Sequence, residues 1–103
     1  WNAHVATGVP LAAFVAPVDS VMVSFSKGLG APVGAALAGR ADFIAQADRV
    51  RKRLGGGLRQ SGVLAAAARY GLEHQLDALA HDHAMARTLA EALDGAGGAR
   101  VVF

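Results

Sequence analysis

Cysteine is absent from the 103 residues of the sequence, which excludes a disulfide framework and a thiolate metal site. No run of about 18 uninterrupted apolar residues occurs, so we expect no transmembrane helix and no membrane partner. A signal peptide is not visible either. Because a chain without cysteine suits a reducing compartment, we expect a cytoplasmic location.

Charged residues are also few, at 17% of the chain against 53% hydrophobic residues, which indicates a globular protein rather than a disordered one. The formal net charge is only +2, but basic residues cluster at Arg49, Arg51, Lys52, Arg53 and Arg59. Such a cluster can contact nucleic acid or an anionic ligand, or it can form a solvated helix face. A nucleic-acid surface would need interleaved aromatic residues, and the nearest are Phe43 and Tyr70. We therefore expect no nucleic-acid partner.

Alternation of residue types predicts a strand over residues 19–26, because Val21, Val23 and Phe25 share one face. A glycine-rich connection follows it, and the apolar run of residues 33–39 predicts a second strand. Two strands joined in this way are expected to pair as antiparallel neighbours.

Helical spacing of apolar residues then predicts a helix over residues 42–53, which the three glycines at 55–57 stop. Residues 61–93 are helical in pattern as well. That stretch is too long for one ordinary helix, so we expect a bend or break near Asp77. Residues 1–16 are expected to be irregular or briefly helical. The pattern alone therefore predicts an α/β fold, with two or three strands and three helices.

The two ends of the chain favour a piece of a longer protein. The sequence begins at Trp1 without a methionine, and residues 100–103 resemble the opening of a strand. A strand without neighbours is not stable by itself. We therefore expect the 103-residue piece alone to be inactive and marginal as a folded unit.

Lys27 is the residue best placed to carry chemistry, because it follows the first strand at the edge where open α/β sheets bind ligands. It is the only charged residue between positions 21 and 37, and an apolar setting favours the neutral amine that a Schiff base requires. Hydroxyls precede it at Ser24 and Ser26, and Gly28 allows close approach of the backbone. From the spacing alone, a lysine that extends from a strand end into solvent is the simpler interpretation.

Histidines could in principle bind a metal, but their spacing does not favour it. His81 and His83 are two apart and so fall on different faces of a helix. His74 and His81 are seven apart and would share a face, but no carboxylate completes a ligand set. We therefore expect no metal site.

Two segments together form a specific signature. Residues 19–34 read Asp-Ser-Val-Met-Val-Ser-Phe-Ser-Lys-Gly-Leu-Gly-Ala-Pro-Val-Gly, and residues 51–60 read Arg-Lys-Arg-Leu-Gly-Gly-Gly-Leu-Arg-Gln. They resemble the low-specificity threonine aldolases, within the aromatic amino acid β-eliminating lyase and threonine aldolase family. Trp1-Asn2-Ala3 is similar to what directly follows the family's Asp-Gly-Ala-Arg motif. The resemblance covers nearly the whole chain.

The resemblance implies a fragment of the large domain of a fold type I enzyme that depends on pyridoxal 5'-phosphate. Short strands followed by three helices would form the later part of this large domain, over residues 1–94. Residues 95–103 would be the linker and the first strand of the small domain. The implied site consists of Lys27 as the catalytic and cofactor-binding residue, Ser24, Ser26 and Arg59 at the cofactor, and Lys52 at the substrate.

The implied activity is a carbon–carbon lyase reaction in amino acid metabolism. A β-hydroxy-α-amino acid such as threonine would be cleaved to glycine and an aldehyde by retro-aldol chemistry. The resemblance also implies a homo-oligomer, with a tetramer expected for the whole enzyme. Two alternatives stay open: another pyridoxal-phosphate lyase that eliminates a β-substituent, and a basic module that binds anions or nucleic acid. A plain surface role is the alternative for Arg59 and Lys52.

Overall fold

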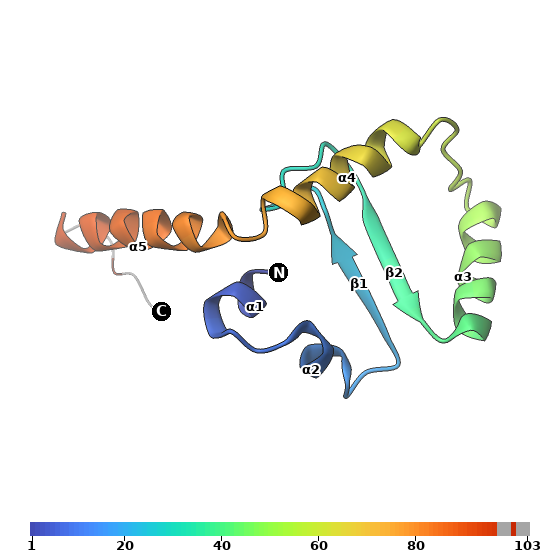
Figure 1. Ribbon diagram of the computed structural model, residues 1–103, viewed down its shortest axis with the longest axis horizontal. Helices are drawn as coiled ribbons and strands as arrows, with labels where there is room; N and C mark the ends of the chain where they lie inside the picture. The colour runs from blue at the N-terminus through green and yellow to red at the C-terminus, as the bar shows by residue number, and fades with distance from the viewer. Residues whose placement is uncertain (97–99, 101–103) are drawn as a thin grey trace.

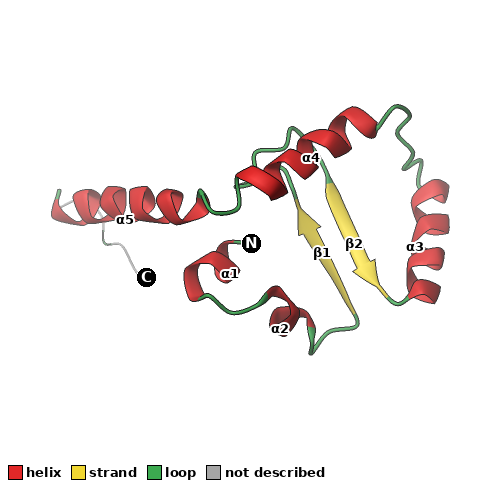
Figure 2. Cartoon of the chain, viewed as in Figure 1, coloured by secondary structure: helices red, strands yellow, loops and turns green. Residues whose placement is uncertain are grey.

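Five helices and two strands make up the part of the chain that the structure, a computed structural model, describes: residues 1–96 and Arg100 (Figure 1; Figure 2). The strand expected at the C-terminal end falls mostly on residues 101–103, outside the described part. The elements in chain order are α1 (Asn2–Thr7), α2 (Leu11–Val15), β1 (Ser20–Ser24), β2 (Ala35–Gly39), α3 (Ala41–Arg53), α4 (Gly62–His74) and α5 (Leu79–Gly95).

The two strands pair antiparallel, as the sequence predicts, with Met22 opposite Leu37 at the centre of the register. Both strands are shorter than expected. Beyond Ser24 the chain forms loop hydrogen bonds instead: the Phe25 N–H donates to the Gly34 C=O at 3.0 Å. The Ala31 N–H donates back to the Phe25 C=O, also at 3.0 Å, so this loop has a defined backbone path.

Helix α3 confirms the prediction for residues 42–53 almost residue for residue. Asp42 lies in its first turn and three basic residues lie in its last turn, so both ends complement the helix dipole. Gly55 takes a φ of 81° directly after the helix, a conformation that glycine adopts readily.

The predicted break near Asp77 is also confirmed, because α4 ends at His74 and α5 begins at Leu79. The loop between the two strands packs at this junction, and its Leu29 is almost fully buried, at 1% exposure. Gly71 of α4 makes the packing possible, since a Cβ there would collide with the Leu29 carbonyl oxygen. Leu79, also 1% exposed, lies against Gly28 in the same way. The buried side chains of the described part are therefore gathered around the loop that carries Lys27.

Residues 1–16 contain two short helices, in agreement with the expectation of brief helical structure. Gly8 ends α1 with a φ of 70°, and its N–H donates to the His4 C=O at 2.8 Å. The fold is therefore mixed α and β, with α1 and α2 before the strands and three longer helices after them.

The chain is open rather than compact, and α5 extends away from the strands (Figure 1). Its radius of gyration is 17.6 Å, whereas a compact domain of this length has one of about 13 Å. No helix of the described residues combines the length and the apolar character needed to cross a membrane. The apolar side chains that stay more than half exposed include Val18, Met22, Leu54, Leu58, Val63, Met85 and Leu89. The described part thus buries little apolar surface, and marginal stability of the chain alone stays a prediction.

Candidate functional site

Lys27 lies in the loop between β1 and β2, shortly after β1 ends at Ser24. The Gly30 N–H donates to the Lys27 C=O at 2.8 Å, which closes a tight turn. Gly30 takes a φ of 70° in this turn, a value that favours glycine. Hydrogen bonds and the packing of Leu29 thus fix the backbone at Lys27, while its side chain is exposed.

An open cavity of about 250 Å³ lies beside Lys27. Its lining combines the first two residues of the chain with the last half of β1 and the start of the loop. The lining residues are Trp1, Asn2, Met22, Val23, Ser24, Lys27 and Gly28. The side chains of the cavity therefore offer one primary amine, one hydroxyl and one amide among aromatic and apolar walls.

Trp1 and Asn2 belong to this site although sequence reasoning did not select them. The Trp1 indole N–H donates to the Ser24 C=O at 2.8 Å, which ties the start of the chain to the end of β1. The His83 Nε2 lies 3.0 Å from the Asn2 Oδ1, and because a carbonyl oxygen only accepts, the imidazole is the donor. The resemblance of Trp1-Asn2-Ala3 to a family segment was the one available signal. No local pattern points to His83, which lies 81 residues away from Asn2.

The two predicted serines lie side by side, with their Oγ atoms 3.2 Å apart. Ser24 lines the cavity, whereas Ser26 reaches it only through its hydrogen bond with Ser24. Both are partly buried. Ser24 can therefore offer a hydroxyl to a ligand beside Lys27, and Ser26 can orient that hydroxyl.

The structure does not bring Lys52 or Arg59 to the Lys27 cavity, since neither lines it. The Lys52 Nζ instead pairs with the Asp48 Oδ2 at 2.8 Å on the exposed surface of α3. This hydrogen bond lowers the pKa of Asp48, and the charges of Lys52 and Arg51 act in the same direction. Arg59 is exposed in the connection between α3 and α4.

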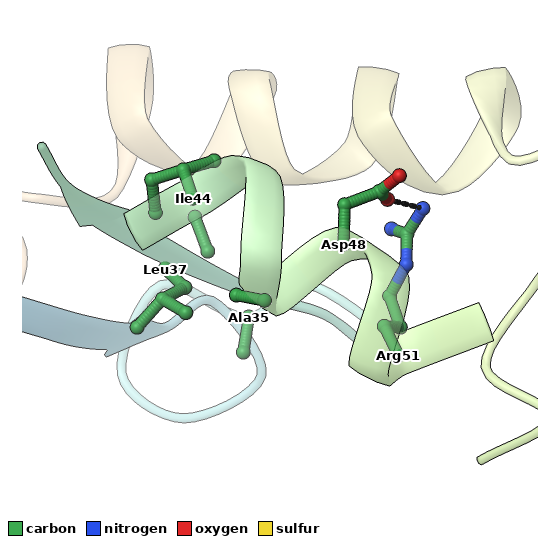
Figure 3. Close-up of a pocket in the computed structure, with 7 residues that line it drawn as sticks. Ala35, Leu37, Ile44, Asp48 and Arg51 are labelled. Atoms are coloured by element: carbon green, nitrogen blue, oxygen red, sulfur yellow. Dashed lines mark hydrogen bonds and ion pairs between the residues drawn. The ribbon is translucent and has the colours of Figure 1, made fainter. Parts of the chain in front are cut away.

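A larger cavity of about 480 Å³ lies between β2 and α3, but fewer reactive side chains line it. Ala35, Leu37 and Ile44 give it apolar walls, as Figure 3 shows. Its two charged residues, Asp48 and Arg51, are paired with each other at 2.7 Å (Figure 3). Because these charges neutralise each other and no free nucleophile lines it, the Lys27 cavity is the better candidate for a reaction site.

The histidines do not form a metal site in the described residues, where no three His, Asp or Glu side chains are grouped for one. The expectation that His74 and His81 share a helix face is wrong, because the break after α4 puts them on different helices. His74 stacks at a tilt against Tyr70, with ring centroids 4.4 Å apart.

Comparison with known proteins defines the class. Residues 1–102 match the family described as beta-eliminating lyase, and the chain belongs to this family. It is 52% identical over 101 residues to low-specificity L-threonine aldolase 1 of Arabidopsis thaliana. It is 47% identical over 97 residues to the low specificity L-threonine aldolase of Escherichia coli K12. It is 45% identical over 97 residues to the probable low-specificity L-threonine aldolase of Schizosaccharomyces pombe.

These alignments cover almost the whole of this chain but a small part of each relative. They include 98%, 94% and 94% of the chain, respectively. The same alignments cover 28%, 29% and 26% of the three relatives. The chain thus spans little more than a quarter of the length of the proteins it matches.

Proposed function

We propose that this chain is part of a pyridoxal-phosphate lyase of the threonine aldolase type, in which Lys27 holds the cofactor. The observation that carries the proposal is the fixed position of Lys27 at the end of β1, beside a cavity with an aromatic wall. In this proposal the fold is type I. Residues 1–94 belong to the large domain, and residues 95–103 lead into the small domain.

The residues of the cavity fit an aromatic aldehyde cofactor. Lys27 is the only side-chain amine among the described lining residues, and the one other lysine, Lys52, is paired with Asp48. Trp1 and the apolar side chain of Met22 offer surfaces for a flat ring, and Ser24 offers a hydroxyl. The open cavity measures about 250 Å³, slightly below the range of about 300–1,000 Å³ that is typical of sites for drug-sized ligands.

The cofactor, when bound, supplies an electron sink for the carbanion left when the bond between the α- and β-carbons breaks. The protein's own residues bind and orient. The Lys27 amine holds the cofactor and can move a proton at Nζ, while Ser24 donates or accepts one hydrogen bond. Trp1, anchored to the Ser24 carbonyl, keeps water from one side.

The substrate of the whole protein, in this proposal, is a β-hydroxy-α-amino acid, and its products are glycine and an aldehyde. The three named relatives support that choice. Lys52 and Arg59 do not line the cavity of their own chain. We therefore place them at the site of a second copy, in a homo-oligomer of the cytoplasm, where Arg59 meets the cofactor and Lys52 meets the substrate. Their charge would pair with a phosphate or a carboxylate.

The test is an assay of the complete gene product that carries these residues, with threonine and pyridoxal phosphate. We expect glycine and acetaldehyde in equal amounts, with no release when the cofactor has been stripped. Release of ammonia and a keto acid from a β-substituted amino acid, without glycine from threonine, would instead favour an eliminating lyase. A salt-dependent complex with nucleic acid, together with no cofactor absorbance, would favour the basic binding module.

A further inference from the structure

One face of α5 contacts both sides of the Lys27 cavity. Leu79 and His83 are four residues apart, so they lie one above the other on the same face of the helix. Leu79 packs against Gly28, the residue after Lys27. His83 donates to the Asn2 Oδ1 at 3.0 Å, and Asn2 lines the cavity. The helix is thus the common support of two segments that lie far apart in the sequence.

The side formed by Trp1 and Asn2 depends on few contacts. The described hydrogen bonds from its side chains to the rest of the chain are two: the Trp1 indole to the Ser24 C=O, and His83 to Asn2. No residue of α1 is buried. Loss of the His83 contact would therefore leave the Trp1 indole as the one side-chain hydrogen bond between this side and the rest of the described chain.

The side of the cavity formed by the loop that carries Lys27 is held by apolar packing. Leu29 and Leu79 are both 1% exposed, and they fix Gly28 through apolar packing that does not involve His83. Removal of the imidazole therefore leaves Lys27 in place and loosens only the opposite side. This separation lets an experiment distinguish positioning of the site from general support of the fold.

We propose that His83 is a positioning residue of the Lys27 site, which holds Asn2 and with it the Trp1 wall against the cavity. The inference rests on the function proposed above. It adds His83, a residue outside the cavity, to those that hold the site in position. His83 does not line the cavity. It acts through Asn2, so its loss should raise KM for threonine more than it lowers kcat.

The experiment uses the complete gene product and the variant His83→Ala, with His81→Ala as the matched control. His81 lies on the same helix, and its exposed side chain makes no hydrogen bond or ion pair within the described residues. In the cofactor-free protein, His83→Ala should increase amide hydrogen exchange in residues 1–7 and leave residues 41–53 unchanged. In the loaded protein it should raise KM for threonine by about 10-fold and change kcat less than about 3-fold.

Two further variants test whether His83 acts through its hydrogen bond to Asn2. His83→Gln retains a side-chain N–H donor and should restore both the exchange pattern and most of the lost affinity. Asn2→Ala removes the acceptor, and its effect should not add to that of His83→Ala in the double variant. Additive effects, an equal effect of His81→Ala, or faster exchange over the whole protein with KM unchanged would overturn the proposal.

The proposed function and the positioning role of His83 can be contradicted independently of each other. A wild-type protein that neither binds pyridoxal phosphate nor releases glycine would contradict the proposed function. The exchange measurement on the cofactor-free protein still decides whether His83 holds residues 1–7. Faster exchange confined to that segment supports the positioning role, and unchanged exchange overturns it.

Discussion

Replacement of Lys27 with alanine should abolish threonine cleavage by the complete gene product, with a loss of at least about 10²–10⁴-fold in kcat/KM. The variant removes the only side-chain amine among the described lining residues, so in the proposed function the cofactor would have no covalent anchor and no group would move a proton at Nζ. Steady-state assays of glycine release should show the loss. Absorbance spectra after gel filtration should show that the cofactor no longer stays with the protein.

Arg69→Gln is the control for this experiment. Arg69 is a basic residue on the exposed surface of α4, and its described ion pair is with Glu73 at 2.7 Å. An exposed pair at this spacing contributes only about 0.3–0.5 kcal/mol, so the control should stay folded and active. A Lys27→Ala protein that retains cofactor and turns over threonine at the rate of this control would refute the role given to Lys27.

Gly71→Ala should destabilise the protein by about 1–2 kcal/mol, against the ordinary preference of a helix for alanine. The new Cβ would collide with the carbonyl oxygen of Leu29, which is backbone and is held in a buried loop. Because the collision is with backbone, the overpacking cost should fall in the upper part of a range of about 1–3 kcal/mol, whereas helix propensity returns about 1 kcal/mol. Urea unfolding of the cofactor-free protein should therefore show a lower midpoint with an unchanged slope.

Gly62→Ala provides the matched comparison. Gly62 begins the same helix, and a Cβ there would meet nothing within 4 Å. This variant should be as stable as the wild type or slightly more stable. If Gly71→Ala proved equally stable, the loop that carries Lys27 would not pack on α4 as the structure has it.

Much of the fold follows from local pattern. Alternation of residue types predicts the first strand, and a short apolar run predicts the second. Helical spacing predicts α3, and the length of the helical stretch predicts the break near Asp77. Both strands were predicted too long. Beyond Ser24 the Phe25 N–H donates to the Gly34 C=O within the loop, and this hydrogen bond replaces strand pairing. Alternation alone does not reveal where such a loop takes over.

For the candidate site, less could be predicted from the sequence than for the fold. Lys27 and Ser24, which line the same cavity, were predicted because the chemistry of a single short segment suggests them. Asn2 and His83 were missed because their contact joins the two ends of the chain, and only the packing of α1 against α5 creates it. The pairing of Lys52 with Asp48, by contrast, is a spacing of four residues on one helix and could have been read from the sequence.

The most direct test of the account is to identify the lysine that carries the cofactor. The complete gene product, loaded with pyridoxal phosphate, is reduced with borohydride, digested and mapped by mass spectrometry. Borohydride fixes the cofactor to the amine that holds it, so the account predicts a pyridoxyl group on Lys27, in the peptide that contains Ser-Phe-Ser-Lys-Gly-Leu-Gly. A pyridoxyl group on Lys52, or on a lysine outside this chain with Lys27 unmodified, would contradict it.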